Sequence, residues 1–445
     1  MIIRRRAAVL ATDLAQRLTD PRQVREWLPD TDASRRYPGQ ELSLSDGMPG
    51  IALLHLERGR DDERALRTAH HWLSGAVTRA AHHTARGLPG LYRGVPALSF
   101  ALSRAELATG RPVPAAHRLA GHVRTVARAL AGGERCREPA AGECATIGTY
   151  DVVSGLAGLG AHLLDGRQHG IDGSDEALAD VLTALTRLTA PVEHNGRTLP
   201  GWWTAQYTAG HAPATVETGH ANVGLAHGAP GPLALLALAW QDGAAVPGQR
   251  EAIGALAEWL TGIQRGGPDG TWWPRTMVLD PCGTVVPGER APGRPSWCYG
   301  TAGIARALYL AGRALDVRAW RESAVAAWHG ALARARRDYD GPETLRLTDA
   351  GLCHGWAGVL QATWRMADDT GDPALRAYLP WLAERVLDLA DIDEPFGLVP
   401  PRPVGGLTGD PAGFLTGAAG VALALHTFAT DAAPATRWDR ALLLA

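Results

Sequence analysis

The sequence contains no lysine, so all 44 of its basic side chains other than histidine are arginines. A lysine Schiff base and the phosphate-binding lysine of a P-loop are therefore excluded. Any cationic role in catalysis falls to arginine or histidine. The formal net charge of −2 lacks the basic excess of a nucleic-acid-binding protein, so no nucleic acid is expected as a partner.

Cysteine and long apolar runs are scarce as well. Five cysteines in 445 residues are too few for a disulfide framework, which favours a reducing, cytoplasmic setting. No stretch approaches the ~20 consecutive apolar residues of a membrane-spanning helix, so no membrane insertion is expected. The first six residues resemble the start of a signal peptide, but the apolar segment that follows, Ala7 to Ala11, is too short for one.

What the sequence does contain is a repeat that runs through the whole chain. Two glycines three or four residues apart, followed by an apolar segment rich in alanine and leucine, recur seven times. The number of residues from one glycine pair to the next suits one pair of helices per repeat. The glycine pairs are Gly47–Gly50, Gly90–Gly94, Gly155–Gly158, Gly228–Gly231, Gly300–Gly303, Gly355–Gly358 and Gly417–Gly420.

The segments after the glycine pairs have helical periodicity. Ile304, Leu308 and Ala311 follow the spacing of one helix face, and Leu233 to Trp240 is apolar throughout, as in a helix buried on most sides. Between such segments lie amphipathic stretches, for example Ile253 to Ile263. Buried helices that alternate with half-exposed ones indicate an inner and an outer layer.

We therefore predict an all-α fold, a double-layered α/α toroid, that forms a single domain over residues 1–445. A closed ring is favoured because the noteworthy polar residues all occupy the same place in the repeat. The alternative is an open α-solenoid scaffold, in which the glycines only allow close packing of helices.

Two stretches interrupt the helical pattern, at about residues 191–218 and 266–295. The first contains Trp202, Trp203 and Tyr207 among glycine, threonine and proline, and the second contains further tryptophans and paired valines. Both are predicted to be loops or short hairpins inserted between helices. They are expected near one rim of the ring, as a contact surface for a peptide or as a structural lid.

Two cysteines and one histidine directly precede equivalent glycine turns. Cys298 stands two residues before the fifth glycine pair, and Cys353 and His354 stand immediately before the sixth. In a closed ring, such turns bring their residues to one end of adjacent inner helices. Two thiolates and one imidazole are a typical ligand set for catalytic Zn²⁺, with the fourth position open. The spacing therefore predicts one zinc ion per chain.

Further polar residues share this register. Asp151 stands shortly before the third glycine pair, and His227 stands directly before the fourth. Taken alone, Asp151 could cap a helix and His227 could be a core histidine. Their coincidence in register with the cysteines favours a functional role for both.

The motifs Ser296–Gly300 and Leu352–Gly355, with Gly224–Gly228 upstream, resemble those of the LanC lanthionine cyclases, and the resemblance extends over essentially the whole chain. It implies seven inner and seven outer helices, and a free-standing enzyme of the class I type. It also implies that zinc is held at one end by Cys298, Cys353 and His354. The other active-site positions of the family correspond to Asp151, His227, Arg294 and Tyr299.

The resemblance further implies the reaction. The substrate would be a ribosomal precursor peptide whose serines and threonines are already dehydrated to dehydroalanine and dehydrobutyrine. Zinc would deprotonate a peptide cysteine, and its thiolate would attack the β-carbon to form a lanthionine or methyllanthionine ring. A lanthipeptide dehydratase and an exporter are implied as further partners.

Roles for the remaining residues follow from the chemistry of this addition. The enolate needs a proton at Cα, and His227 is the expected donor because histidine titrates nearest to neutral pH. Asp151 is expected to orient the His227 imidazole or to help deprotonate the thiol. Arg294 is expected to stabilise the enolate oxygen, and Tyr299 to supply a hydrogen bond.

Two alternatives keep the fold and the metal but change the function. A LanC-like enzyme could join glutathione or another small thiol to dehydroamino acids. These motifs do not discriminate between the addition of a small thiol and the addition of a peptide cysteine. A non-catalytic peptide-binding scaffold would hold zinc structurally, usually with four protein ligands, and Cys282 is available as a fourth. Cys136 and Cys144 receive no role.

Two other kinds of helical enzyme are disfavoured. Asp368 to Asp372 matches the DDxxD pattern of terpene synthases, but Gly371 and Pro373 predict a loop where that motif needs a helix. A toroidal glycosidase needs two inward-facing carboxylates, and Asp151 is the one acid expected at the inner turns.

Overall fold

The computed structural model describes residues 1–28, 39–81, 90–194, 196–205, 219–267, 269–340, 347–400 and 410–445. These residues contain sixteen α-helices and eight short strands. None of the helices in these ranges is long and apolar enough to cross a membrane. The chain divides into two compact units, a first unit of Met1–His122 with Leu347–Arg440 and a second unit of Val123–Arg346 with Ala441–Ala445.

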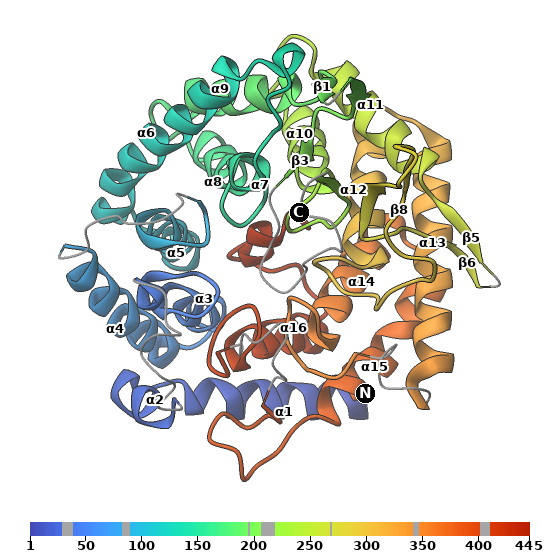
Figure 1. The fold of residues 1–445 in the computed structure, drawn as a ribbon. Helices are drawn as coiled ribbons and strands as arrows, with labels where there is room; N and C mark the ends of the chain where they lie inside the picture. The colour runs from blue at the N-terminus through green and yellow to red at the C-terminus, as the bar shows by residue number, and fades with distance from the viewer. Residues whose placement is uncertain are drawn as a thin grey trace. The chain divides into compact units, whose positions relative to one another are not determined.

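In the first unit, buried helices that follow glycine turns pack against half-exposed helices. The buried helices are α3 (Met48–Arg58), α5 (Gly94–Thr109), α14 (Trp356–Thr370) and α16 (Ala418–Thr430). Figure 1 shows α4 (Glu63–Ala80) beside α3, α15 (Pro373–Leu387) beside α14 and α1 (Ile2–Arg17) beside α16. The shorter helices of this part are α2 (Pro21–Trp27) and the 3-10 turn η2 (Gln40–Leu42).

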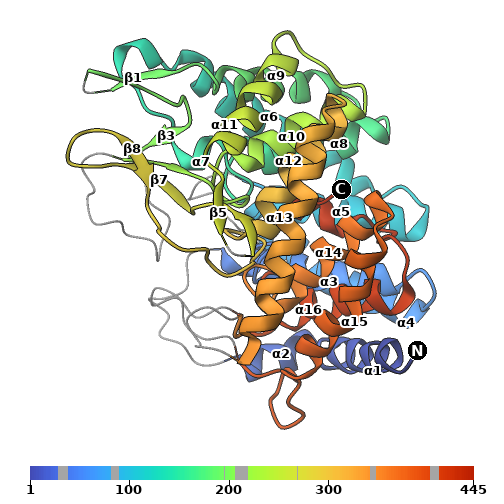
Figure 2. The same ribbon diagram turned by 90° about the vertical axis from the view of Figure 1, so that its right-hand side faces the viewer.

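The second unit repeats this pairing. Its buried helices are α8 (Leu156–Gln168), α10 (Pro230–Gln241) and α12 (Thr301–Ala314). Their partners are α9 (Ser174–Arg187), α11 (Gln249–Gly262) and α13 (Arg318–Arg337), and Figure 2 shows α13 running alongside α12. Its shorter segments are α7 (Ile147–Tyr150), η3 (Pro139–Ala141) and η4 (Asp338–Asp340). Two of the three divisions between the units fall within α6 (Pro114–Cys136) and η5 (Trp438–Leu442).

Burial follows the expected pattern of apolar residues. Every residue of α12 from Thr301 to Gly312 is buried, whereas α11 buries only one face, with Ile253 and Leu256 inaccessible and Glu251 and Glu258 exposed. A helix that is apolar all round needs neighbours on all sides, and an amphipathic one covers it from a single side. The predicted alternation of buried and half-exposed helices is confirmed.

The second glycine of most pairs is required by a close backbone contact. At four of these glycines, an added Cβ would lie 1.8 to 2.1 Å from the carbonyl oxygen of the residue six positions earlier. The chain before the helix therefore folds back onto the first helical turn, and no larger residue fits without movement. The four glycines are Gly50, Gly303, Gly358 and Gly420.

The second repeat corrects one prediction of register. Helix α5 begins at Gly94 with Arg93 as its N-cap, whereas in five other pairs the first glycine is itself the N-cap. Gly94 is thus the first residue after the N-cap, and Gly90 lies in the turn before the helix. Gly94 has a φ of +59°, which suits glycine at this helix start.

In the second unit, the described residues of the two predicted inserts form short hairpins and part of a small sheet. One hairpin pairs β1 (Val192–His194) with β2 (Arg197–Leu199), and another pairs β5 (Arg265–Gly267) with β6 (Gly270–Trp272). The antiparallel sheet has the order β3 (Trp203–Thr204), β4 (His220–Asn222), β7 (Thr276–Leu279) and β8 (Val285–Pro287). Tyr207 lies outside the described residues.

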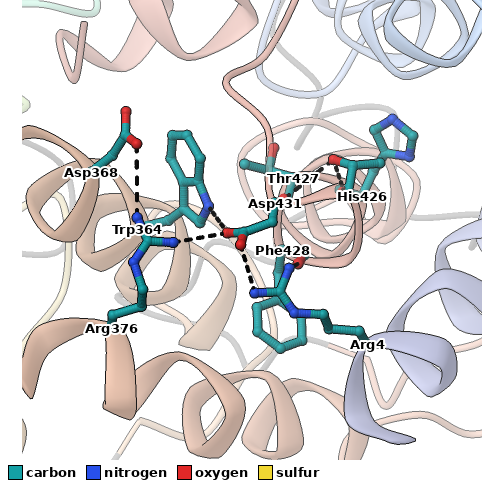
Figure 3. A network of polar contacts seen from close by, with 9 residues as sticks. Arg4, Trp364, Asp368, Arg376, His426, Thr427, Phe428 and Asp431 are labelled. Carbon is teal, nitrogen blue, oxygen red and sulfur yellow. Dashed lines mark hydrogen bonds and ion pairs between the residues drawn. The ribbon is translucent and has the colours of Figure 1, made fainter. Parts of the chain in front are cut away.

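A polar network fixes the N-terminal helix of the first unit (Figure 3). The carboxylate of Asp431, at the end of α16, accepts hydrogen bonds from Arg4 of α1 at 2.9 Å, Trp364 of α14 at 3.3 Å and Arg376 of α15 at 3.1 Å. Arg4 also donates to the carbonyl of Phe428. An arginine at the start of the chain thus anchors a helix within this unit.

The DDxxD pattern spans the last residues of α14 and the turn that follows, so the predicted loop is correct for Gly371 and Asp372 but wrong for Asp368 and Asp369, which are helical. Helix α14 ends at Thr370, Gly371 takes a left-handed conformation, and Asp372 caps α15 through the backbone N–H groups of Ala374 and Leu375. Asp368 faces Arg376 at 3.9 Å. These carboxylates serve the turn and an ion pair, which leaves no support for a diphosphate site.

Candidate functional site

In the second unit, the turns before α8, α10 and α12 are tied to one another by their backbones. The N–H of Val152 donates to the carbonyl of Ala226 at 3.0 Å, and the N–H of Ala226 donates to the carbonyl of Cys298 at 3.3 Å. Ala226 and Cys298 both stand two residues before the first glycine of their pairs. Consequently His227 and Tyr299, one residue further on, are equivalent positions in neighbouring turns.

Asp151 and His227 form a tight pair across two of these turns. Nδ1 of His227 lies 2.6 Å from Oδ2 of Asp151, which is 1 % exposed. The other oxygen of Asp151 accepts from the N–H of Ser154 at 2.6 Å, so the carboxylate also holds its own turn. Within the described residues, Nε2 of His227 has no hydrogen-bond partner, and the side chain is 23 % exposed. The histidine is therefore oriented by Asp151 and leaves Nε2 accessible.

Tyr299 completes this group. Its ring centre lies 6.1 Å from that of His227, and its hydroxyl accepts a hydrogen bond from Nδ2 of Asn222 at 3.3 Å. Oδ1 of Asn222 in turn accepts from the N–H of Gly224 at 2.9 Å. Of the residues predicted for catalysis, Asp151, His227 and Tyr299 are thus brought together within the second unit.

Cys298 is held rigidly in the same turn. Cys298 is 7 % exposed, and its sulfur lies 3.6 Å from Oγ of Ser296. The indole of the adjacent Trp297 is fully buried and donates to the carbonyl of Leu442 at 3.0 Å. The C-terminal segment therefore supports the backbone that carries the thiol.

Arg294 lies at the start of this turn, and its carbonyl accepts from the N–H of Ser296 at 2.8 Å. The side chain is partly exposed. Within the described parts of the chain, its guanidinium has no hydrogen-bond or ion-pair partner. It is a cation that is available for a ligand.

In the first unit, Cys353 and His354 occupy the equivalent place before α14. The N–H of Cys353 donates to the carbonyl of Leu415, in the turn before α16, at 2.8 Å. Nε2 of His354 lies 3.5 Å from Oδ2 of Asp349, and the other oxygen of that carboxylate accepts from the N–H of Gly351 at 2.9 Å. The thiol and the imidazole thus project from one rigid turn that a buried carboxylate supports.

Two buried tyrosines accompany these groups. Burial raises the pKa of Tyr92 well above its usual value, and the nearby Cys353 raises it further. Burial likewise raises the pKa of Tyr150 strongly, and the neighbouring Asp151 adds to this. Both phenols therefore stay protonated and act as neutral hydrogen-bond donors.

The remaining cysteines lie elsewhere, and all five are free thiols. Cys136 is exposed at the end of α6, and Cys282 is exposed in the turn between β7 and β8. Cys144 is half-buried, with its sulfur 3.7 Å from Nδ1 of His194, and burial raises its pKa.

Two residues that hold these turns are not among the sequence predictions. Asn222 and Asp349 both stand six residues before the first glycine of their pairs, and each accepts a hydrogen bond from the N–H two residues later. The expectation that Asp151 is the one acid at these turns is wrong, because Asp349 is a second. Alignment of the turns in register is the signal that identifies both.

Comparisons with known proteins identify the family and the fold of this chain. The family model of the lanthionine synthetase C-like proteins matches residues 38–443. Among solved structures, nisin cyclase aligns with a TM-score of 0.70 and 21 % identity over 95 % of this chain and 97 % of that one. An unsaturated glucuronyl hydrolase from Bacillus sp. GL1 aligns with a TM-score of 0.44 and 16 % identity over 74 % and 84 % of the two chains. No curated protein sequence matches. The alignment with nisin cyclase confirms the predicted all-α fold class, the α/α toroid.

Proposed function

Because this chain belongs to the lanthionine synthetase C-like family, we propose that it is a zinc-dependent lanthionine cyclase. In this proposal it adds cysteine thiolates of a dehydrated ribosomal precursor peptide to dehydroalanine or dehydrobutyrine. The products are the thioether rings of lanthionine and methyllanthionine. The name of the similar structure, nisin cyclase, is consistent with a cyclisation reaction.

Cys298, Cys353 and His354 are the proposed ligands of one zinc ion per chain. Support comes from their donor chemistry and from their register, since each stands one or two residues before a glycine turn. Two thiols and one imidazole suit a catalytic zinc, which keeps a fourth position for substrate. When bound, zinc would lower the pKa of a substrate thiol so that it reacts as a thiolate at neutral pH.

His227 is the proposed proton donor. The sulfur–carbon bond forms at Cβ of the dehydro residue, the carbon–carbon double bond is lost, and the resulting enolate takes a proton at Cα. Asp151 accepts from Nδ1 of His227, so Nε2 is the atom that exchanges the proton. The proton lost by the thiol balances the one gained at Cα, and the imidazole ends the cycle unchanged.

Arg294 and Tyr299 are proposed to stabilise the enolate. Arg294 carries a permanent charge, and its guanidinium lacks an ion-pair partner among the described residues. The hydroxyl of Tyr299, which accepts a hydrogen bond from Nδ2 of Asn222 at 3.3 Å, is the proposed donor to the enolate oxygen. Preorganised donors of this kind stabilise charge that develops in the transition state.

The observation that carries the proposal is the Asp151–His227 pair, 2.6 Å apart, in a turn that is tied by backbone hydrogen bonds to the turn of Cys298. A buried carboxylate that orients a partly exposed histidine is an arrangement for proton transfer. A scaffold with structural zinc would have no use for it. No structural feature among the described residues favours a small thiol over a peptide thiol.

The test is thiol consumption from a dehydrated peptide that also contains cysteine, followed by alkylation of the remaining thiols and mass spectrometry. Wild-type protein is expected to consume the thiol. Asp151→Asn keeps the contact with Ser154 but presents a donor to Nδ1 of His227, so the rate should fall by ~10²–10⁴-fold. The control is Asp172→Asn, since Asp172 is an exposed residue between α8 and α9 in the same unit.

Three other results would sink the proposal. Zinc binding without thiol loss would favour the scaffold, and glutathione adducts on a cysteine-free dehydrated peptide, without cyclisation, would favour the small-thiol enzyme. Equal rates for wild type and Asp151→Asn would remove His227 from the mechanism.

A cytoplasmic location and a single domain over residues 1–445 are parts of the same proposal, with a dehydratase and an exporter as further partners. Five free cysteines suit a reducing compartment. A precursor peptide must meet the dehydratase before the cyclase and the exporter after it, because each step consumes the product of the one before.

A further inference from the structure

Asp349 is a buried carboxylate in the first unit. It is 6 % exposed and stands at the start of the turn that leads to His354. Oδ1 accepts from the N–H of Gly351 at 2.9 Å, and Oδ2 lies 3.5 Å from Nε2 of His354. One oxygen therefore belongs to the turn and the other faces the imidazole.

The turn itself does not require a negative charge. In the second unit, Asn222 has the same position relative to its glycine pair and the same contact, since its Oδ1 accepts from the N–H of Gly224 at 2.9 Å. A neutral amide is thus sufficient to hold such a turn. Burying a carboxylate costs more than burying an amide unless a partner compensates for it. The imidazole of His354, whose Nε2 lies 3.5 Å from Oδ2, is a partner that uses the negative charge of Asp349.

The geometry decides which nitrogen of His354 stays available. An ionised carboxylate only accepts hydrogen bonds, so the nitrogen that faces it, Nε2, carries the proton of the neutral ring. The lone pair is then on Nδ1. Histidines that bind metals commonly donate their other N–H to a carboxylate, which fixes the tautomer and makes the ligand more basic.

The turn is too tight for Asp349 to move away. A Cβ on Gly355 would lie 2.3 Å from Oδ1 of Asp349 and 2.4 Å from the nitrogen of Gly351. On the other side of His354, the backbone of Cys353 is fixed by its bond to Leu415. The carboxylate and the imidazole are therefore held in a constant relation.

We propose that Asp349 is a positioning residue that prepares His354 to bind zinc through Nδ1. The inference rests on the proposed function, because it concerns a ligand of the proposed zinc site. Asp349 acts only through His354 and touches neither substrate nor reacting atoms.

The test compares Asp349→Asn with Asp410→Asn in the full chain. In Asp349→Asn, the amide oxygen can still accept from Gly351, as that of Asn222 accepts from Gly224, but the amide nitrogen that then faces Nε2 of His354 cannot act as an acceptor. Asp410 is a matched control because its Oδ1 accepts from the N–H of Ala412 at 2.8 Å, in the turn before α16 of the same unit. No histidine follows in that turn.

The measurement is the zinc dissociation constant, by competition with a chromophoric chelator, together with the thermal midpoint of the metal-free protein. We expect Asp349→Asn to weaken zinc binding by ~10–100-fold with an unchanged midpoint, and Asp410→Asn to leave both unchanged. Equal zinc affinity for wild type and Asp349→Asn would overturn the proposal. So would a loss of affinity that comes with a lowered metal-free midpoint, because the carboxylate would then serve only the fold.

Two further controls keep the outcome interpretable. If Asp349→Asn folds poorly, Asp349→Ser replaces it, since its hydroxyl can still accept from Gly351 while the carboxylate is absent. A wild-type protein without zinc, or one whose zinc survives His354→Ala, would defeat the proposed function itself. A wild-type protein that binds zinc no more tightly than Asp349→Asn would defeat only the role of Asp349.

Discussion

The two units each present a histidine directly before a glycine turn, and the two histidines meet their carboxylates in opposite ways. His227 faces Asp151 through Nδ1 at 2.6 Å, whereas His354 faces Asp349 through Nε2 at 3.5 Å. Asp151 belongs to the neighbouring turn, 76 residues away in sequence, while Asp349 belongs to the same turn as its histidine. Their position in the sequence, directly before a glycine turn, would by itself make these two histidines equivalent.

The difference shows that the carboxylate partner of each imidazole, and not its position before a glycine turn, determines which ring nitrogen faces away from the carboxylate. With Asp151 at Nδ1, His227 leaves Nε2, the nitrogen farther from the backbone, without a partner among the described residues. With Asp349 at Nε2, His354 presents Nδ1, close to the rigid turn that also carries Cys353. An exposed nitrogen far from the backbone suits proton transfer, and a fixed nitrogen close to the backbone suits metal binding.

The largest expected effect comes from removing each histidine in turn. His354→Asn should lose most of the bound zinc and all cyclisation, because a ligand is missing. His227→Asn should keep about one zinc per chain, while its rate falls by ~10²–10⁴-fold through loss of the acid. Zinc content by mass spectrometry and thiol consumption, measured on the same samples, check both variants.

A suitable control is His169→Asn in the second unit, where Nδ1 bonds the carbonyl of Asp165. It should leave zinc content and rate unchanged. If His227→Asn lost zinc, or His354→Asn retained it, the division of labour between the two turns would be wrong.

Buried histidines extend the comparison to stability. Burial lowers the pKa of His55 in the first unit to about 4, and burial lowers that of His220 in the second unit to about 4 as well. Both are neutral when folded at mildly acidic pH, whereas the unfolded chain takes up protons there. Stability is therefore expected to fall as the pH drops from about 6.5 towards 4, by ~3 kcal/mol for His55 alone.

The replacement His55→Gln isolates this effect in the first unit. Nε2 of His55 lies 3.0 Å from the carbonyl of Leu18, and a glutamine amide can donate to the same carbonyl. Denaturant unfolding of the two proteins at neutral pH and at about pH 4.5 should show a shallower pH dependence for the variant. Parallel curves would mean that His55 is not protonated differently in the folded and unfolded states.

Much of the fold could be predicted from the sequence because the repeat reflects packing. The second glycine of a pair is needed where the backbone folds back, and the apolar periodicity reports burial directly. The predicted register of the second repeat is wrong because Arg93 fills the N-cap position that a glycine holds in five other repeats. Gly90, in the turn before the helix, has the spacing from Gly94 that is expected of the first glycine of a pair, although it does not occupy that position.

The site was predictable only in part. Cysteine is rare here, so Cys298 and Cys353 are conspicuous in sequence, and their common register indicates a shared purpose. Asp349 and Asn222 are not conspicuous, because aspartate and asparagine in turns usually serve only the local backbone. Which nitrogen of a histidine meets a carboxylate depends on the path of the chain between turns, and no sequence spacing specifies it.

The smallest expected effect concerns the glycines that follow the two histidine turns. A Cβ at Gly358, after His354, would lie 1.9 Å from the carbonyl of Leu352, whereas one at Gly231, after His227, would come no closer than 2.8 Å to its neighbours. Backbone can yield less than side chain, so Gly358→Ala should cost ~2–3 kcal/mol and Gly231→Ala ~1 kcal/mol of the free energy of unfolding. Denaturant unfolding of the two variants checks this order.

The control for this pair is Gly254→Ala in α11, where an added Cβ meets nothing within 4 Å. Removing a helical glycine at such a position should stabilise the protein by ~0.5–1 kcal/mol, because the unfolded chain loses freedom and no contact is strained. A cost at Gly358 that exceeds the one at Gly231 therefore reports the backbone contact itself and not a general effect of alanine. An equal cost at the two positions would show that the two histidine turns are equally tight in solution.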